Sequence, residues 1–250
     1  MCRGKSRRSS EIRVMSKEKL IFALDVPSKE EALELVEELQ DEVGAFKIGL
    51  QLFTAEGASF VRQLVGRGHK IFLDVKFHDI PNTVAAASQE AARLGVWMFN
   101  LHAAGGEEMM KRTADETRSF CSKESLPAPL IIAVTVLTSA DSKTLQSSGV
   151  MLEPGELVVK YARSAHKCGL DGVVASPLEA GIIRTKVEND QFLIVTPGIR
   201  PAFATKDDQK RVTTPRSAVQ SGSDFLVVGR PIRMAKDRRD AARRIVTEMA

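Results

Sequence analysis

Short apolar runs recur along the chain, and longer segments with apolar positions at helical spacing separate them. Most of the runs are continuously apolar, which is typical of parallel strands that helices cover on both faces. We predict eight strands, at residues 20–24, 45–48, 70–75, 97–101, 130–136, 172–175, 192–195 and 225–228.

The segments between the runs predict amphipathic helices. Ser28 and Glu31 form an S-x-x-E capping box before apolar residues at helical spacing, which marks the start of the first helix. Further helices are predicted at residues 55–66, 84–94, 106–119, 156–168, 177–187 and 231–249. Eight strand–helix units favour an α/β fold of the (β/α)8 TIM barrel type, in a single domain. An open doubly wound sheet usually has fewer strands, and no G-x-G-x-x-G or P-loop sequence supports one.

The composition fits one barrel domain behind a basic extension. With 250 residues and 43% hydrophobic content, the chain can form one large core. The formal net charge of +4 is concentrated near the N-terminus, so we expect a disordered extension at residues 1–16 and the barrel at residues 17–250. The rest of the chain is nearly balanced and has no basic stripe with aromatic residues, so nucleic-acid binding is not expected.

Signals for secretion, membranes and disulfides are missing from the sequence. Residues 1–16 lack the apolar region of a signal peptide, and no stretch has the roughly 18 apolar residues of a membrane span. The three cysteines are widely spaced without a C-x-x-C pair, so neither a disulfide framework nor a zinc site is indicated. We therefore expect a cytoplasmic protein that does not bind membranes.

The run D-V-K-F-H-D-I-P-N-T at residues 74–83 carries the clearest chemistry. It begins at the end of a predicted strand, where period 2 puts Asp74 and Lys76 on one face, and Asp79 follows in a loop. Lysine and aspartate are rarely buried unless paired, so the cluster indicates a site rather than a core. Two nearby anions favour the protonated amine, which makes Lys76 a fixed cation and proton donor rather than an amine nucleophile.

Two further charges belong to the same edge of the predicted barrel. Asp25 ends the first strand and Lys47 lies in the second, and active sites of such barrels form at the carboxyl ends of the strands. Asp74 and Asp79 could in principle hold magnesium, but Lys47 and Lys76 already neutralise these carboxylates. The four histidines form no metal-ligand pair, so no metal site is predicted.

The loops after the seventh and eighth strands predict a phosphate site. They read T-P-G-I-R-P at residues 196–201 and V-G-R-P-I at residues 228–232. The glycines allow close backbone approach to a ligand, a helix opens at Pro231, and Arg230 is placed for a bidentate contact. Both loops together favour phosphate binding over two ordinary turns.

Two more segments of the predicted rim carry polar residues. The segment 202–219 is long for a strand–helix connection and suits a mobile lid, from which Gln209 could reach a ligand. Thr138 follows the fifth strand and could hydrogen-bond a heterocycle or cap a turn.

Together these segments resemble a known family. Its motifs are Asp25, Lys47, the run at 74–83, N-L-H-A-A-G-G at 100–106, T-V-L-T-S at 135–139, V-T-P-G-I-R-P at 195–201 and V-V-G-R-P-I at 227–232. Over residues 18–249 the chain resembles the orotidine 5′-phosphate decarboxylase family of the bacterial type. The resemblance implies a homodimeric (β/α)8 carboxy-lyase of pyrimidine biosynthesis. Such an enzyme converts orotidine 5′-monophosphate to uridine 5′-monophosphate and carbon dioxide without a metal or organic cofactor.

The resemblance also implies roles for the candidate residues. Lys76 would stabilise a carbanion and donate the proton, with Asp74 and Asp79 on either side, and Asp79 and Thr83 would reach into the partner subunit's site. Asp25 and Lys47 would hold the ribose hydroxyls and the charge network. The other expected substrate contacts are Thr138 at the pyrimidine ring, Arg200, Gln209, Gly229 and Arg230 at the phosphate, and Ile80 and Pro197.

Three alternatives stay open at this point. A related keto-sugar-phosphate decarboxylase or aldol synthase would use a similar D-x-K-x-x-D run with magnesium, but it gives no reason for I-P-N-T after Asp79 or for Gln209. A Schiff-base aldolase would need a neutral Lys76, which the flanking carboxylates disfavour. A catalytically silent barrel could instead bind nucleotide or nucleic acid through its basic extension.

Overall fold

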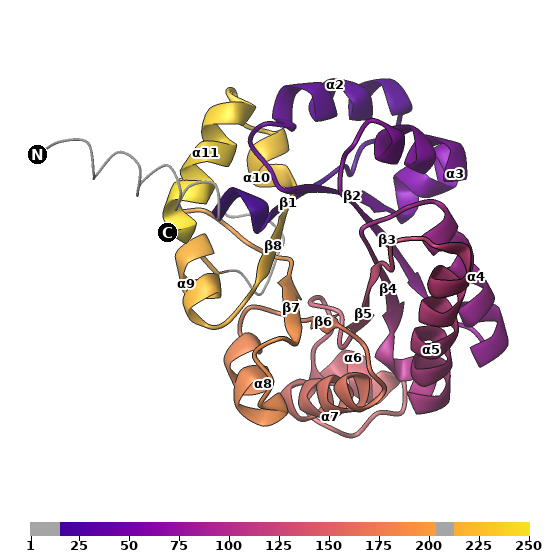
Figure 1. The fold of residues 1–250 in the computed structure, drawn as a ribbon. Coiled ribbons are helices and arrows are strands. Elements are labelled where there is room, and N and C mark those ends of the chain that lie inside the picture. The colour runs from indigo at the N-terminus through magenta and orange to yellow at the C-terminus, as the bar shows by residue number, and fades with distance from the viewer. Residues whose placement is uncertain (1–15, 204–212) are drawn as a thin grey trace, which may run out of the picture.

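Eight parallel strands close into a barrel in the order of the sequence (Figure 1). The computed structural model describes residues 16–203 and 213–250. The strands are β1 (Leu20–Ala23), β2 (Ala45–Gly49), β3 (Ile71–Phe77), β4 (Met98–His102), β5 (Leu130–Val134), β6 (Gly172–Val174), β7 (Leu193–Thr196) and β8 (Phe225–Val228). The ring closes where β8 pairs with β1. The predicted (β/α)8 barrel and its eight strands are confirmed.

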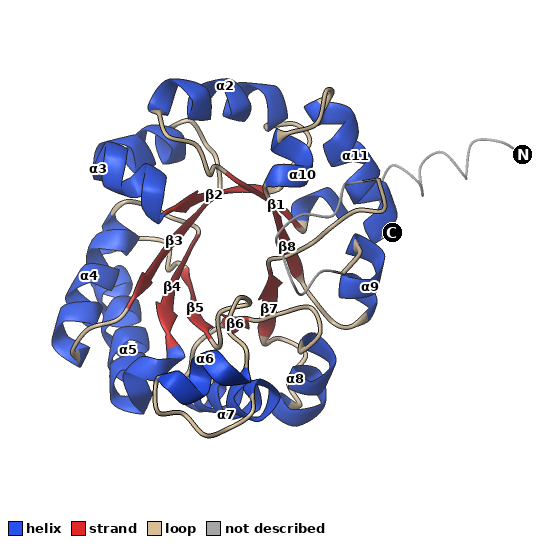
Figure 2. Ribbon diagram, turned by 180° about the vertical axis from the view of Figure 1, so that it is seen from behind, coloured by secondary structure: helices blue, strands red, loops and turns tan. Residues whose placement is uncertain are grey.

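Helices surround the ring of strands on all sides, as Figure 1 and Figure 2 show from opposite directions. They are α2 (Lys29–Leu39), α3 (Leu50–Gly66), α4 (Pro81–Arg93), η1 (Ala103–Gly105), α5 (Gly106–Glu124), α6 (Ser142–Ser147), α7 (Pro154–Lys167), α8 (Ala180–Val187), α9 (Pro215–Gln220), α10 (Arg230–Arg233) and α11 (Arg238–Met249). Ser28 caps α2 as predicted, because its hydroxyl accepts a hydrogen bond from the Glu31 backbone N–H at 3.3 Å. Among the helices of the described ranges, none has the length and apolar character needed to cross a membrane.

Two predicted segments differ from the structure in more than their boundaries. The helix predicted at residues 231–249 is two helices, α10 and α11, because Asp237 starts a new one by accepting a hydrogen bond from the Asp240 backbone N–H. The segment 202–219, predicted as a lid, contains α9, which Thr214 caps. A helix of six residues is too short for apolar periodicity to reveal it. The remainder of the segment includes Gln209, which lies outside the described residues.

The predicted N-terminal extension is almost entirely outside the described residues. Ser16 is its one described residue, and it is helical and 8% exposed. Disorder over residues 1–16 therefore stays a prediction, whereas the barrel predicted to begin at residue 17 has its first strand at Leu20.

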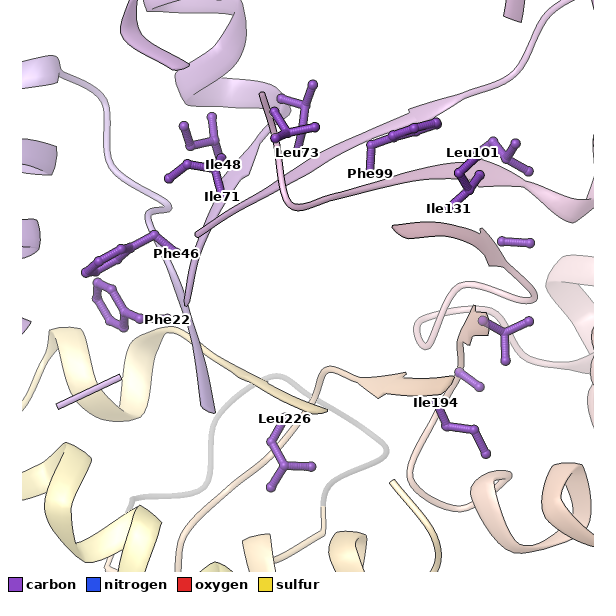
Figure 3. Close-up of a cluster of buried hydrophobic side chains, with 14 of the residues drawn as sticks. Phe22, Phe46, Ile48, Ile71, Leu73, Phe99, Leu101, Ile131, Ile194 and Leu226 are labelled. Atoms are coloured by element: carbon purple, nitrogen blue, oxygen red, sulfur yellow. The ribbon is translucent and has the colours of Figure 1, made fainter. Parts of the chain in front are cut away.

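Side chains of the strands alternate between two apolar cores. Phe46, Ile194 and Leu226 point away from the ring towards the helices, as Figure 3 shows, and belong to the larger core. The smaller core fills the barrel interior with Ile21, Ala23, Ala45, Phe72, Met98, Ile132, Val195 and Val227. Because successive inward positions are two residues apart, Lys47 follows Ala45 and Asp74 follows Phe72 on the inner face. The barrel interior thus changes from apolar to charged towards the carboxyl ends of its strands.

Candidate active site

Charged side chains meet at the carboxyl ends of β1, β2 and β3. Lys47 is 7% exposed, and its Nζ lies 2.9 Å from Asp25 Oδ1 and 3.3 Å from Asp74 Oδ2. The Nζ of Lys76 lies 2.6 Å from Asp74 Oδ1. Asp74 therefore bridges two ammonium groups, and the structure brings together four of the residues predicted for the site.

Neighbouring charges decide the ionisation of this cluster. Burial raises the pKa of the Asp74 carboxyl, but Lys47, Lys76 and two hydrogen bonds together lower it more, so its pKa is below the usual value. Burial lowers the pKa of Lys47, but Asp74 and Asp25 raise it more, so its pKa is above the usual value. Asp74 is therefore an anion and Lys47 a cation at neutral pH.

The backbone of Lys76 adopts a left-handed conformation. Its φ is 54°, a region that costs an L-residue about 1–2 kcal/mol. Leu73 pairs with Phe99 and Phe77 pairs with Leu101, so three residues of β3 face one residue of β4. Asp74 and Lys76 meet as the pattern predicts, but they do so across a bulge rather than along a regular strand.

The cluster lines a cavity of about 150 Å³. Lys47, Asp74 and Lys76 provide its charged part, and Thr138 and Pro197 enter from the loops that follow β5 and β7. The rest of the lining is apolar, from Phe72, Val134, Val136, Leu137, Val174 and Val227. A largely apolar cavity with a few charged groups is typical of small-molecule sites. Because the dielectric constant is lower there than in water, charges inside the cavity interact more strongly.

Asp79 lies away from the cluster within this chain. Its side chain is exposed, and its Oδ1 accepts a hydrogen bond from the Ile80 backbone N–H at 2.6 Å. Ile80 is 66% exposed at the start of α4, and Thr83 is exposed in the first turn of that helix. Among the described residues only Asp74 pairs with Lys76. The loop after β3 turns Asp79 outwards, so the flanking role expected for Asp79 stays a prediction that depends on the partner subunit.

The predicted phosphate loops lie beside the charged cluster. Gly198 has a φ of 80°, a left-handed conformation that glycine adopts without strain. A Cβ atom built on Gly229 would lie 3.6 Å from Asp25 Oδ2, so the loop after β8 runs next to the end of β1. Arg230 opens α10, which spans only four residues rather than continuing into the long helix predicted from Pro231. A helix of this length offers a phosphate only a weak helix dipole.

The two described ends of the segment after β7 are hydrogen-bonded to each other. The Arg200 backbone N–H donates to the Thr213 carbonyl at 2.9 Å, and Arg200 Nη1 donates to the Ile199 carbonyl at 3.0 Å. Residues 200 and 213 are thus held together on either side of the undescribed stretch that includes Gln209. Arg200 is half-buried at this point.

Two histidines lie near the rim. The rings of His78 and His102 are 5.4 Å apart. Burial, together with the nearby His78 and Lys76, lowers the pKa of His102 despite the opposing charge of Asp74. Across residues 16–203 and 213–250 there is no group of three His, Cys, Asp or Glu side chains arranged to hold a metal ion.

Sequence reasoning missed one polar residue of the cluster. Asn100 on β4 is fully buried, donates to Asp74 Oδ1 at 2.7 Å and accepts from the Lys76 backbone N–H at 2.8 Å. The signal was present, because Asn100 is a polar residue inside an apolar strand, at an inward position between Met98 and His102.

Known proteins match both the sequence and the structure. Residues 18–245 match the family described as "Orotidine 5'-phosphate decarboxylase / HUMPS family". The chain is 49% identical over 240 residues to orotidine 5′-phosphate decarboxylase of Syntrophomonas wolfei subsp. wolfei, covering 94% of this chain and 99% of that protein. It is 53% identical over 238 residues to that of Syntrophotalea carbinolica, covering 95% and 97%.

A solved structure agrees with this result. The crystal structure of orotidine 5′-phosphate decarboxylase from Lactobacillus acidophilus superimposes with a TM-score of 0.81 at 37% sequence identity. The superposition covers 92% of this chain and 98% of that one. The barrel described above is therefore the fold of that protein as well.

Proposed function

The chain belongs to the orotidine 5′-phosphate decarboxylase / HUMPS family, and we propose that the cavity at its charged rim is the site of the reaction. The chain is a carboxy-lyase of pyrimidine biosynthesis that converts orotidine 5′-monophosphate to uridine 5′-monophosphate and carbon dioxide. One observation carries the assignment of the site. The Lys76 ammonium contacts Asp74 at 2.6 Å in a largely apolar cavity at the carboxyl ends of the barrel strands.

The reaction needs a cation beside the carbon that loses carbon dioxide. When the bond to the carboxylate breaks, its electron pair stays on a ring carbon with little delocalisation. A fixed ammonium next to that carbon stabilises the developing charge and then supplies the proton. Lys76 fits both roles, and the neutral amine that remains takes a proton back from water.

Asp74 would lie close to the departing carboxylate and repel it. Two unit charges ~4 Å apart interact by about 4 kcal/mol at an effective dielectric constant near 20. Enzymes typically lower barriers by ~8–23 kcal/mol, so repulsion alone is too small. Stabilisation of the carbanion by Lys76 must supply much of the remainder, and Asp74 also keeps the ammonium in place.

The other residues of the rim would bind the rest of the nucleotide. Asp25 and Lys47 are suited to the ribose hydroxyls, since they form a pair at 2.9 Å beside the cavity, and Thr138 and Pro197 line it near the ring. The phosphate would lie between the loops after β7 and β8. Its contacts there would be Arg200, Gln209, Gly229 and Arg230. Binding energy gained at the phosphate can hold the unfavourable charges of the reacting end together.

We also propose a homodimer in which Asp79, Ile80 and Thr83 complete the site of the partner subunit. The outward position of Asp79 and the 66% exposure of the apolar Ile80 support this arrangement. A mixture of Lys76→Ala and Asp79→Ala chains tests it, because each mixed dimer would regain one site with both native residues. We expect two inactive proteins to give about a quarter of native activity after subunit exchange. Activity that stays absent in a verified mixed dimer would contradict the shared site.

The site is proposed to work without a metal ion. Lys47 Nζ lies between Asp25 and Asp74, at 2.9 and 3.3 Å, so an ammonium already occupies the position where two carboxylates could hold magnesium. We further propose that the protein acts in the cytoplasm, since the described cysteines, Cys121 and Cys168, are free thiols.

The loss of ultraviolet absorbance of orotidine 5′-monophosphate tests the function directly. The purified protein is treated exhaustively with chelator before the substrate is added. Rapid loss of absorbance is expected, with no gain on adding magnesium. Activity only with magnesium and a keto-sugar phosphate would reassign the chain to the metal-dependent branch and overturn the proposal.

A further inference from the structure

Asn100 lies where the charged cluster meets the irregular end of β3. It is fully buried at the centre of β4, and its side chain faces into the barrel next to Asp74. No substrate contact is proposed for it above. Its two hydrogen bonds both go to residues of the proposed catalytic pair.

The first hydrogen bond holds the backbone of Lys76. Between the pairs Leu73–Phe99 and Phe77–Leu101, β3 has three residues where β4 has only Asn100. The Lys76 N–H therefore lacks a regular backbone partner on β4, and Asn100 Oδ1 accepts it at 2.8 Å. This contact fixes a residue whose φ of 54° is unfavourable for any side chain.

The second hydrogen bond fixes the carboxylate of Asp74. Asn100 Nδ2 donates to Asp74 Oδ1 at 2.7 Å, and the same oxygen receives the Lys76 ammonium at 2.6 Å. A carboxylate at position 100 could still accept the Lys76 N–H, but it would repel Asp74. An amide donates on one side and accepts on the other, so the single side chain of Asn100 makes both hydrogen bonds.

We propose that Asn100 is a positioning residue for the decarboxylation: it locks the left-handed backbone of Lys76 and the orientation of Asp74, so that the Lys76 ammonium points at the reacting carbon. The inference rests on the proposed function of the same cavity. A displacement of a catalytic group by about 1 Å can cost about 100-fold in rate, so loss of this lock acts on the chemical step. The phosphate loops follow β7 and β8 and do not contain Asn100, so loss of the lock should change substrate affinity little.

Asn100→Leu tests the proposal, because leucine keeps the shape of asparagine and removes both hydrogen bonds. We expect kcat to fall by about 100-fold or more while KM changes by less than about fivefold. The acid limb of the kcat profile should also move to higher pH, because the pKa of the Asp74 carboxyl rises when it loses a hydrogen-bond donor. A merely structural residue would lower the unfolding temperature without moving this limb.

Asn189→Leu is the matched control. Asn189 also bonds on two sides, to His166 at 2.8 Å and to the Gln191 backbone N–H at 2.9 Å, but it is only half-buried and lies outside the cavity. Its substitution should leave kcat and the pH profile unchanged. Asn100→Asp separates the two bonds, since it keeps the acceptor for Lys76 and loses the donor to Asp74.

The outcomes separate this proposal from the function on which it rests. If the native protein leaves orotidine 5′-monophosphate unchanged, the proposed function fails. If the native protein decarboxylates it and a folded Asn100→Leu does so at a similar rate with the same acid limb, the positioning role is overturned. Should Asn100→Leu not fold, Asn100→Ser is measured by the same criteria, with the same two results for and against.

Discussion

The strand β3 carries a lysine ion pair near each end, and the surroundings of the two pairs differ. Lys70, just before the amino end, lies 2.9 Å from Glu18, and the two side chains are 52% and 45% exposed. Lys76, near the carboxyl end, lies 2.6 Å from Asp74, and these side chains are 28% and 13% exposed. A lysine–carboxylate pair is solvated at the amino end of the strand, and a second such pair faces a cavity at its carboxyl end. Burial and neighbouring groups, rather than pairing itself, distinguish a site from a surface ion pair.

At the amino end of the barrel, carboxylates stabilise the strands instead of forming a site. Asp171 and Asp224 each accept a backbone N–H of the neighbouring strand, from Ile131 and Ile194, at 2.7 Å. Arginines balance their charges: Arg118 pairs with Asp171 and Arg184 with Asp224. These carboxylates bind backbone and arginine groups of the fold itself, so the amino end contributes stability and the carboxyl end contributes chemistry.

Lys76→Ala should produce the largest difference between the two ends. General acid catalysis is typically worth ~10²–10⁴-fold and a fixed electrostatic donor ~10²–10³-fold, so we expect kcat to fall by at least about 10⁴-fold. Cooperative unfolding should remain, since Lys47 still pairs with Asp74. Steady-state decarboxylation measures the loss. Turnover close to native in this variant would remove Lys76 from the mechanism.

Arg230→Ala should have the next largest effect, through the phosphate. We expect kcat/KM to fall by about 100-fold with part of the loss in kcat, because remote binding energy supports the reacting end. Orotidine, which lacks the phosphate, provides the control: native protein and variant should process it at the same low rate. An effect on KM alone, or an equal loss with orotidine, would argue against a phosphate contact.

Asp224→Ala should affect stability rather than activity. It leaves the buried Ile194 N–H and the Arg184 side chain without this partner, and an unsatisfied buried donor costs about 1–3 kcal/mol. Denaturant unfolding should show a loss of this size in the free energy of unfolding, while kcat stays near native. Asp190→Ala, an exposed aspartate of the turn before β7, should change neither. A large fall in kcat for Asp224→Ala would break the division between the two ends.

Lys70→Ala should have the smallest effect and matches Lys76→Ala in residue type, at the opposite end of the same strand segment. Exposed ion pairs contribute about 0–1 kcal/mol, so both the free energy of unfolding and kcat should remain close to native. The same two assays measure it beside Lys76→Ala. If Lys70→Ala lost activity to a similar degree, general damage to β3 would explain both variants.

The sequence predicted the barrel well because its strands are buried on both faces. Continuous apolar runs such as residues 20–24 and 225–228 stand out from the amphipathic helices between them, and their number leads to the barrel. The carboxyl rim followed from strand ends, so Asp25, Lys47, Asp74 and Lys76 were correctly expected to lie together. Boundaries were less accurate at the end of the chain, where the cap at Asp237 divides α10 from α11.

The local geometry of the site could not be predicted in the same way. Period 2 assumes a regular strand, whereas the bulge before Phe77 and the left-handed Lys76 depend on pairing with β4, which lies more than 20 residues further along the chain. The sequence marks Asn100 as a polar residue inside an apolar strand, but its two partners follow only from the pairing of β3 with β4. The outward turn of Asp79 is a property of the loop after β3, which sequence spacing alone does not reveal.

Exchange of the hydrogen at carbon 6 of uridine 5′-monophosphate tests the central claim most directly. In deuterium oxide, reversal of the final proton transfer forms the same carbanion beside Lys76 without any loss of carbon dioxide. We predict that the native protein and Lys70→Ala incorporate deuterium at carbon 6 and that Lys76→Ala does not, as followed by proton NMR. Exchange by Lys76→Ala as fast as by the native protein would contradict the claim that this lysine stabilises and protonates the carbanion.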